Sequence, residues 1–189
     1  MKKRLFICLA FATAFSTFAL AQDNRVKPFE FEVGAGMTMG SKYGLDKAVP
    51  GPNAYVEGRI NLFDTPWDLG VQTSFGAAFR KQGDKRYDSS NKFGIEVFTD
   101  YNFRYWDRIA PFVGLGVGRT AVVTSLPLTG ADDATVTSKT TSPAFLLNPR
   151  AGIELFGHLR LSAEYKCTFQ KESSYFALNL GIAFGGGKK

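Results

Sequence analysis

The chain has 189 residues, of which 44% are apolar, 14% aromatic and 21% charged, and its formal net charge at pH 7 is +6. This composition is too apolar and too weakly charged for a disordered chain, and the length fits one domain or at most two. One His and two Cys argue against a zinc centre or a disulfide scaffold. We therefore predict no metal site and no cofactor.

The first element in chain order is an export segment, residues 1–21. It begins with three basic residues, continues with an almost wholly apolar run from Leu5 to Phe18 and ends in the small-x-small sequence Ala19-Leu20-Ala21. This pattern predicts a secretory signal peptide cleaved after Ala21, because the apolar run is shorter than the ~20 residues of a spanning helix. Cleavage lowers the net charge from +6 to +3, so we expect no nucleic-acid partner.

After the signal, apolar and polar side chains alternate with a period of two almost to the end of the chain, which is typical of strands with one apolar face. These strands make up one barrel domain, residues 22–184, and a short polar tail, residues 185–189, follows it. We predict eight strands, at residues 29–39, 54–63, 68–80, 92–105, 111–123, 145–156, 159–169 and 176–184.

The predicted connections are alternately long and short. Those at 40–53, 81–91 and 124–144 are long, whereas those at 64–66, 106–110 and 157–158 are short. Short turns on one rim and long loops on the other are typical of up-and-down antiparallel barrels in outer membranes. Because an even number of strands returns the chain to its starting side, we expect both termini in the periplasm. The loops around Tyr43, Lys85 and Ala134 should then face outside.

The direction of the apolar face decides between a membrane barrel and a soluble protein. The apolar face carries roughly forty side chains, whereas the packed layers of an eight-stranded barrel hold on the order of twelve. These side chains therefore face lipid, unless two sheets of a secreted β-sandwich enclose them. Long strands, and aromatic residues gathered at both strand ends, favour the membrane barrel.

Two segments carry a family resemblance. Residues 110–118 (APFVGLGVG) and 159–166 (LRLSAEYK) are similar to strands of the small eight-stranded outer-membrane β-barrels of Gram-negative bacteria, the OmpA/OmpX-like family. The last strand, ending at Phe184, resembles the aromatic-terminated insertion signal of such barrels, although residues 185–189 follow it. The resemblance implies an all-β fold, an eight-stranded antiparallel up-and-down transmembrane β-barrel in the bacterial outer membrane.

The resemblance also implies partners. These are the lipid and lipopolysaccharide of the outer membrane, and the barrel-assembly and periplasmic chaperone machinery that delivers such barrels. The sequence identifies no extracellular ligand.

Charged side chains gather on the polar face, which lines the lumen of a membrane barrel. We expect them to pair with one another, because an unpaired buried charge is costly; a proton or ion pathway is the alternative. Gly114, Gly116 and Gly118 on the same face should make room for long neighbours, which leaves no open bore. The candidate network comprises Glu30, Glu32, Glu57, Arg59, Arg80, Glu96, Asp100, Arg104, Arg150, Glu154, Arg160, Glu164 and Lys166.

The pattern of a lipid-modifying enzyme is missing. Outer-membrane enzymes that act on lipid A use a His with a nearby Ser or acid on the outer side, whereas His158, the one His of the chain, falls in a predicted short turn. No Ser lies in a nucleophile-elbow sequence. We predict no catalytic residue, and a structural or surface-interaction role through the long loops. A narrow conduit for small solutes or ions is the alternative, and a lipid-modifying enzyme is a weaker third.

Arg119 is an exception on the apolar face. It shares the strand parity of Val113, Leu115 and Val117, so it should project towards the lipid near the outer interface and reach a lipid phosphate there. A bulge near Gly118 would instead turn it into the lumen. Pro149 raises the same question for its own strand, because a proline inside a strand usually requires a bulge.

Overall fold

The computed structural model describes residues 28–39, 48–62, 65–82, 86–103, 108–129, 135–169 and 174–185. The expected signal peptide at 1–21 and nearly all of the expected tail lie outside these residues, as do Arg104, Tyr43, Lys85 and Ala134. No helix formed by the described residues is long and apolar enough to cross a membrane.

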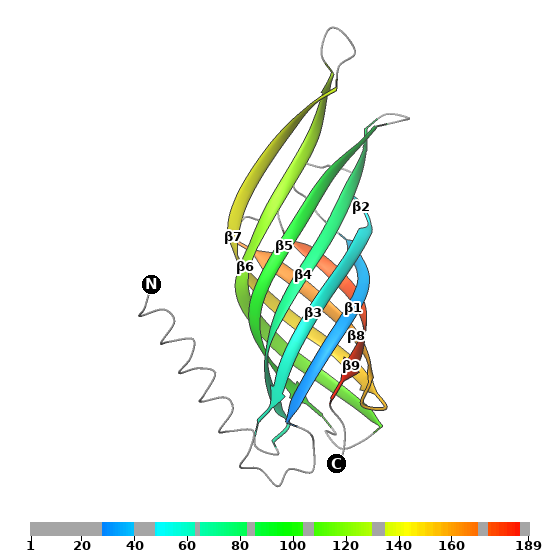
Figure 1. The fold of residues 1–189 in the computed structure, drawn as a ribbon, viewed down its shortest axis with the longest axis vertical. Coiled ribbons are helices and arrows are strands. Elements are labelled where there is room, and N and C mark those ends of the chain that lie inside the picture. Colours follow the sequence, from blue (N-terminus) through cyan, green and yellow to red (C-terminus); the bar gives the residue numbers. More distant parts are fainter. Residues whose placement is uncertain are drawn as a thin grey trace, which may run out of the picture.

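The strands form one antiparallel sheet that closes on itself as a barrel (Figure 1). Their order in the sheet is β2-β4-β3-β1-β9-β8-β7-β6-β5, and pairing between β4 and β5 completes the ring. Because β2 has only two residues and pairs with the far end of β4, eight strands make the wall, as the sequence predicts. Their bounds are β1 Phe29–Met39, β2 Ala48–Val49, β3 Gly51–Asn61, β4 Trp67–Gln82, β5 Arg86–Asn102, β6 Ile109–Thr129, β7 Thr135–Leu155, β8 Leu159–Thr168 and β9 Tyr175–Phe184.

The two ends of the barrel differ. At the end where β1 begins and β9 finishes, the strands are joined by short turns, and we call this the short-turn end. The connection from β7 to β8 has only three residues, and Phe156 and Gly157 adopt positive φ values of 57° and 69° there. A left-handed conformation at two successive positions lets the chain reverse within so few residues.

Two predicted long loops are largely strand. The β4–β5 ladder continues until Gln82 pairs with Arg86, and the β6–β7 ladder until Thr129 pairs with Thr135. The connections predicted at 81–91 and 124–144 were therefore too long. An antiparallel ladder is held by backbone hydrogen bonds and continues without an apolar face. In the β6–β7 extension, frequent Thr and Val also favour the extended chain. Both hairpins project beyond the other strands in Figure 1.

The pairing register stays constant along each pair of neighbouring barrel strands. No residue is inserted at Gly118 or at Pro149, so neither position has the bulge considered above. The β7–β8 ladder only omits the pairs beside Pro149, which has no N–H to donate. A constant register preserves the alternation of inward and outward side chains from one end of the wall to the other.

One slip in register does occur, between β2 and β3. Val49 lies opposite Phe79, whereas Asn53 lies opposite Gly76, so one extra residue is accommodated around Pro50. Ala77 lies on β4 beside this slip, and its strand parity is that of the apolar outer face, yet it is only 5% exposed. The constant β4–β5 register leaves this parity unchanged. Its burial therefore depends on what covers β4 there, since a bulge on a neighbouring strand bends the sheet locally.

The distribution of polar and apolar side chains is the reverse of that in a soluble protein. Glu57, Arg160 and Asp100 have no exposed surface, whereas outward residues such as Val117 and Leu180 are nearly half exposed. The core is therefore polar and the wall presents its apolar face outward. Buried apolar residues are few, and the large ones among the described residues are Tyr55, Phe98, Phe112, Leu146 and Tyr175.

Candidate functional site: the charged barrel interior

Arg59 joins four carboxylates near the short-turn end. It lies on β3, and its Nη1 is 2.5 Å from Glu32 and 3.1 Å from Glu57. Its Nη2 is 2.9 Å from Glu154, and its Nε donates a hydrogen bond to Glu30. Since the Arg59 side chain is only 1% exposed, one buried guanidinium compensates acids from three strands, β1, β3 and β7.

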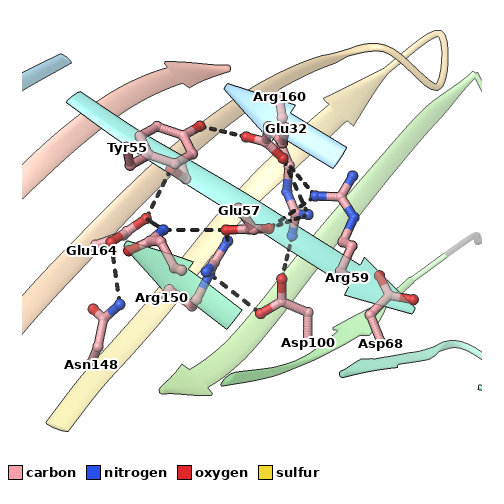
Figure 2. A network of polar contacts seen from close by, with 12 residues as sticks. Glu32, Tyr55, Glu57, Arg59, Asp68, Asp100, Asn148, Arg150, Arg160 and Glu164 are labelled. Carbon is pink, nitrogen blue, oxygen red and sulfur yellow. Dashed lines mark hydrogen bonds and ion pairs between the residues drawn. The ribbon is translucent and has the colours of Figure 1, made fainter. Parts of the chain in front are cut away.

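Two further arginines surround the middle of the lumen. Arg150 of β7 places Nη2 2.9 Å from Glu57 and Nε 3.4 Å from Asp100. Arg160 of β8 donates from Nη2 to Asp100, and its Nη1 lies 3.5 Å from Glu57 and 3.7 Å from Glu32. Glu57 and Asp100 therefore lie between cations from different strands, as Figure 2 shows.

A third cluster is centred on Lys166 of β8. Its Nζ is 2.5 Å from Glu96 and 2.7 Å from Glu164. Asn148 donates to the same two acids, at 2.8 Å and 3.2 Å. All four side chains are at most 2% exposed, so this cluster lies in the interior too.

Gln72 connects the clusters into one network. Its Nε2 donates to both Glu57 and Glu164 at 3.2 Å, and its Oε1 accepts a hydrogen bond of 2.6 Å from Lys166. The chain of contacts therefore runs from the Arg59 cluster through Glu57 and Gln72 to the Lys166 cluster without leaving the described lumen.

Aromatic rings occupy part of the remaining space. The guanidinium carbon of Arg150 lies 4.2 Å from the centroid of the Phe98 ring, and that of Arg160 lies 3.7 Å from the Phe112 ring. Both rings are 1% exposed. A cation over an aromatic face is favourable, so these rings fill the lumen and also help to hold the arginines.

Glycines on the inner face leave room for these large side chains. A Cβ on Gly114 would lie 1.9 Å from Asp100 Oδ1, and a Cβ on Gly70 would lie 2.3 Å from the Phe98 ring. Both distances are far inside van der Waals contact. The glycines therefore accommodate neighbouring side chains and do not widen a channel.

The comparisons with known proteins identify the fold. No family model matches the sequence, and no curated protein matches it. The crystal structure of Neisserial surface protein A matches with a TM-score of 0.54 and 13% identity, over 85% of this chain and 98% of that one. The fold of the present chain is thus that of the OmpA/OmpX-like outer-membrane barrels. At this identity the likeness concerns the fold alone.

Two other outer-membrane barrels superpose less closely. The N-terminal β-barrel domain of Pseudomonas aeruginosa OprF has 15% identity and a TM-score of 0.44, over 82% of this chain and 97% of that domain. The Ail protein of Yersinia pestis has 13% identity and a TM-score of 0.44, over 83% of this chain and 97% of that one.

Within this barrel fold, most of the residues of the candidate network lie together. Eleven of the thirteen take part in the ion pairs described above, and they come from all strands of the wall except β4, β6 and β9. The other two are Arg80 and Arg104. The backbone of Arg80 belongs to β4, and its side chain, like all of Arg104, lies outside the described part of the chain.

Two charged lumen residues were missed by the sequence analysis. Asp68 accepts a hydrogen bond of 2.6 Å from Asn102, and the Lys92 ammonium lies 4.1 Å from the centroid of the Tyr175 ring. Both are at most 2% exposed. They are the first residues of their predicted strands, and their parity is that of the polar face. Strand parity applied from the first residue of each strand would have found them.

Arg119 and His158 lie outside the lumen network. Arg119 is exposed on the outer face of β6, where Ile95 and Phe145 are its partners in the ladder. His158 is exposed in the short β7–β8 turn, and its Nδ1 lies 3.3 Å from the Ala183 carbonyl oxygen. No group of three His, Cys, Asp or Glu side chains among the described residues could hold a metal ion.

Proposed function

We propose that the protein is a non-enzymatic β-barrel of the bacterial outer membrane, with a closed interior, that serves a structural or surface-interaction role through its long outer hairpins. The observation that carries this proposal is the reversed distribution of polarity. The interior contains the ion-paired network, and the wall presents apolar side chains outward.

The outer face supports the membrane location. Among the described residues, twenty-seven large apolar side chains are more than a third exposed, which far exceeds the exposed apolar patch of an ordinary soluble monomer. Aromatic residues lie towards both ends of this face. Trp67 contacts Tyr101 edge-on near the short-turn end, and Phe145 contacts Phe169 towards the hairpin end. Aromatic girdles at both edges of an apolar band are a property of outer-membrane barrels.

The packed interior supports the absence of a pore. An eight-stranded wall encloses a bore that side chains can fill, and here the three clusters and two aromatic rings come from opposite sides of the wall. Separating them would leave buried charges without partners, at a cost of several kcal/mol per ion. The network therefore favours a closed interior over a conduit for solutes.

Conductance measurements test the proposal. The protein is folded into lipid, its folded state is verified by heat-modifiable gel migration, and the same sample is added to a planar bilayer alongside a general porin as the positive control. We expect little or no steady conductance from this protein. Reproducible unitary conductance from the folded band would reject the closed interior and establish the conduit alternative.

A further inference from the structure

Among the outward strand positions whose side chains the structure describes, Arg119 is the only charged one. Its neighbours across the ladder are Ile95 on β5 and Phe145 on β7, which are 53% and 47% exposed. The constant register on both sides excludes a bulge that would turn its side chain into the lumen. None of the carboxylates that the structure describes forms an ion pair with it.

The position of Arg119 along β6 places it at the edge of the apolar band. From Ile109, the first residue of β6, to Arg119 the strand advances ten residues, or about 33 Å at ~3.3 Å per residue. With a strand tilt of 35–45° this is a rise of roughly 23–27 Å, and the apolar band of such barrels is ~25 Å tall. The guanidinium thus lies where hydrocarbon gives way to lipid headgroups, on the side of the long hairpins.

The wall beneath Arg119 is suited to acyl chains. Val117 follows it on the same face towards the short-turn end and is 45% exposed. Phe145 beside it contacts Phe169, with ring centroids 5.4 Å apart. A ligand that fits this surface has an anionic head at the level of Arg119 and hydrocarbon below it.

We propose that Arg119 is the cation of a binding site for the phosphate group of an acyl-chain lipid in the outer leaflet, whose chains lie against the apolar wall beneath it. A guanidinium offers paired donors that match two phosphate oxygens, and the interaction is strong where water is partly excluded. The inference rests on the membrane location proposed above.

Native mass spectrometry of the folded protein in detergent tests this site. Lipid A is added to the wild-type protein and to the Arg119→Leu, Arg119→Lys and Arg108→Leu variants. Arg108 is exposed near the short-turn end, so its replacement removes the same charge at the opposite rim. We expect Arg119→Leu to weaken lipid A binding about tenfold, in line with the loss of one charge-assisted contact. Arg119→Lys should lie in between, and Arg108→Leu should match the wild type.

Two further arms identify the ligand. Lipid A with its phosphates removed should bind as weakly to the wild type as lipid A binds to Arg119→Leu, and inorganic phosphate alone should not bind measurably. Equal binding of lipid A to the wild type and Arg119→Leu, equal binding of the dephosphorylated lipid, or an equal loss in Arg108→Leu would overturn the proposal. Arg119-dependent binding of inorganic phosphate as tight as that of lipid A would instead identify a free-phosphate site.

The folding assay separates this proposal from the proposed function. A protein that gives no heat-modifiable band in detergent or lipid contradicts the outer-membrane barrel itself. A folded barrel whose lipid A binding is independent of Arg119 contradicts only the lipid site.

Discussion

Glu57 is the acid that contacts three arginines and Gln72 in the interior. It lies directly opposite Glu32 on β1 and Gln72 on β4 in the ladder. Two carboxylates facing each other across a strand pair repel, and this is tolerated because Arg59 lies within 3.1 Å of both. Arg150 is a second cation beside Glu57, at 2.9 Å. The cations that compensate Glu57 thus come both from its own strand, as Arg59 does, and from the opposite side of the wall, as Arg150 does.

Replacing Glu57 by Ala should strongly destabilise the barrel. The change leaves three arginines partly uncompensated in a buried position, and removing one partner of a buried pair typically costs about 3–5 kcal/mol. The free energy of unfolding is measured by urea titration in lipid, with heat-modifiable migration as the readout. Tyr165→Phe, on the outward face, is the matched control and should change stability by less than ~0.5 kcal/mol. Wild-type stability of Glu57→Ala would show that the network contributes little.

Gly114 should not tolerate a side chain, whereas Gly58 should. A Cβ at Gly114 would overlap Asp100 Oδ1 and also approach the Thr99 carbonyl oxygen to 2.6 Å. The nearest atom to a Cβ at Gly58 would be on the Phe29 ring, at an ordinary 4.0 Å. We expect Gly114→Ala to lose about 1–3 kcal/mol through overpacking, and Gly58→Ala to be neutral or slightly stabilising in the same urea assay. Equal effects of the two changes would contradict the close packing at Gly114.

At the scale of elements, the β6–β7 hairpin consists of two parts with different roles. Its inner part pairs on both sides, because β6 contacts β5 up to Ser125 and β7 contacts β8 up to Leu146. Beyond Ser125, the described residues 126–129 and 135–138 pair only with each other. The inner part belongs to the closed wall, and the outer part is an extension beyond it.

Deleting residues 126–138 and joining Ser125 to Lys139 through Asn-Gly should leave the barrel stable. The deleted residues form no ladder with β5 or β8, and Asn-Gly suits a two-residue hairpin. We expect the urea midpoint to change by less than the equivalent of ~1 kcal/mol. A control deletion removes Val117–Gly118 and Leu146–Leu147 instead, which preserves parity but disrupts the pairs with β5 and β8. It should abolish the heat-modifiable band, and loss of the band in the outer deletion would refute this division.

At the scale of the whole molecule, the polar interior and the apolar outer face determine which surroundings the barrel can occupy. The ring of β1 and β3 to β9 closes on itself and leaves no open sheet edge in the wall below the hairpins. This is a requirement for strands that cross hydrocarbon. The even number of strands also brings the start of β1 and the end of β9 to the same end, where Phe31 pairs with Phe184.

Thiol labelling should establish the orientation. In a Cys167→Ala background, Ala134→Cys places a thiol between the outer ends of β6 and β7, and Thr65→Cys places one in a short turn. An impermeant thiol reagent on intact cells should label the first variant and not the second, and both should react once the cells are lysed. Labelling of Thr65→Cys alone would reverse the topology.

Strand parity predicted which side chains face the lumen and which face outward. The alternation of Tyr55, Val56 and Glu57 was enough to separate inward from outward positions, since side chains of a strand must alternate. The same rule did not predict the burial of Ala77, which depends on what covers β4 beside the register slip. It also underestimated the hairpins, because backbone pairing in a segment without an apolar face leaves no trace in the hydropathy pattern.

The sequence by itself determined the strand number, the apolar outer face and the composition of the interior, because these follow from local alternation and from volume. The partners inside the lumen were decided only by the tertiary structure. Arg59 contacts Glu154, and Gln72 contacts Glu164, across more than ninety residues of chain. Which charges meet depends on strand stagger and on the closure of β1 against β9, and neither is encoded in any one strand. Electrostatic pairing then selects among the side chains that closure brings within reach.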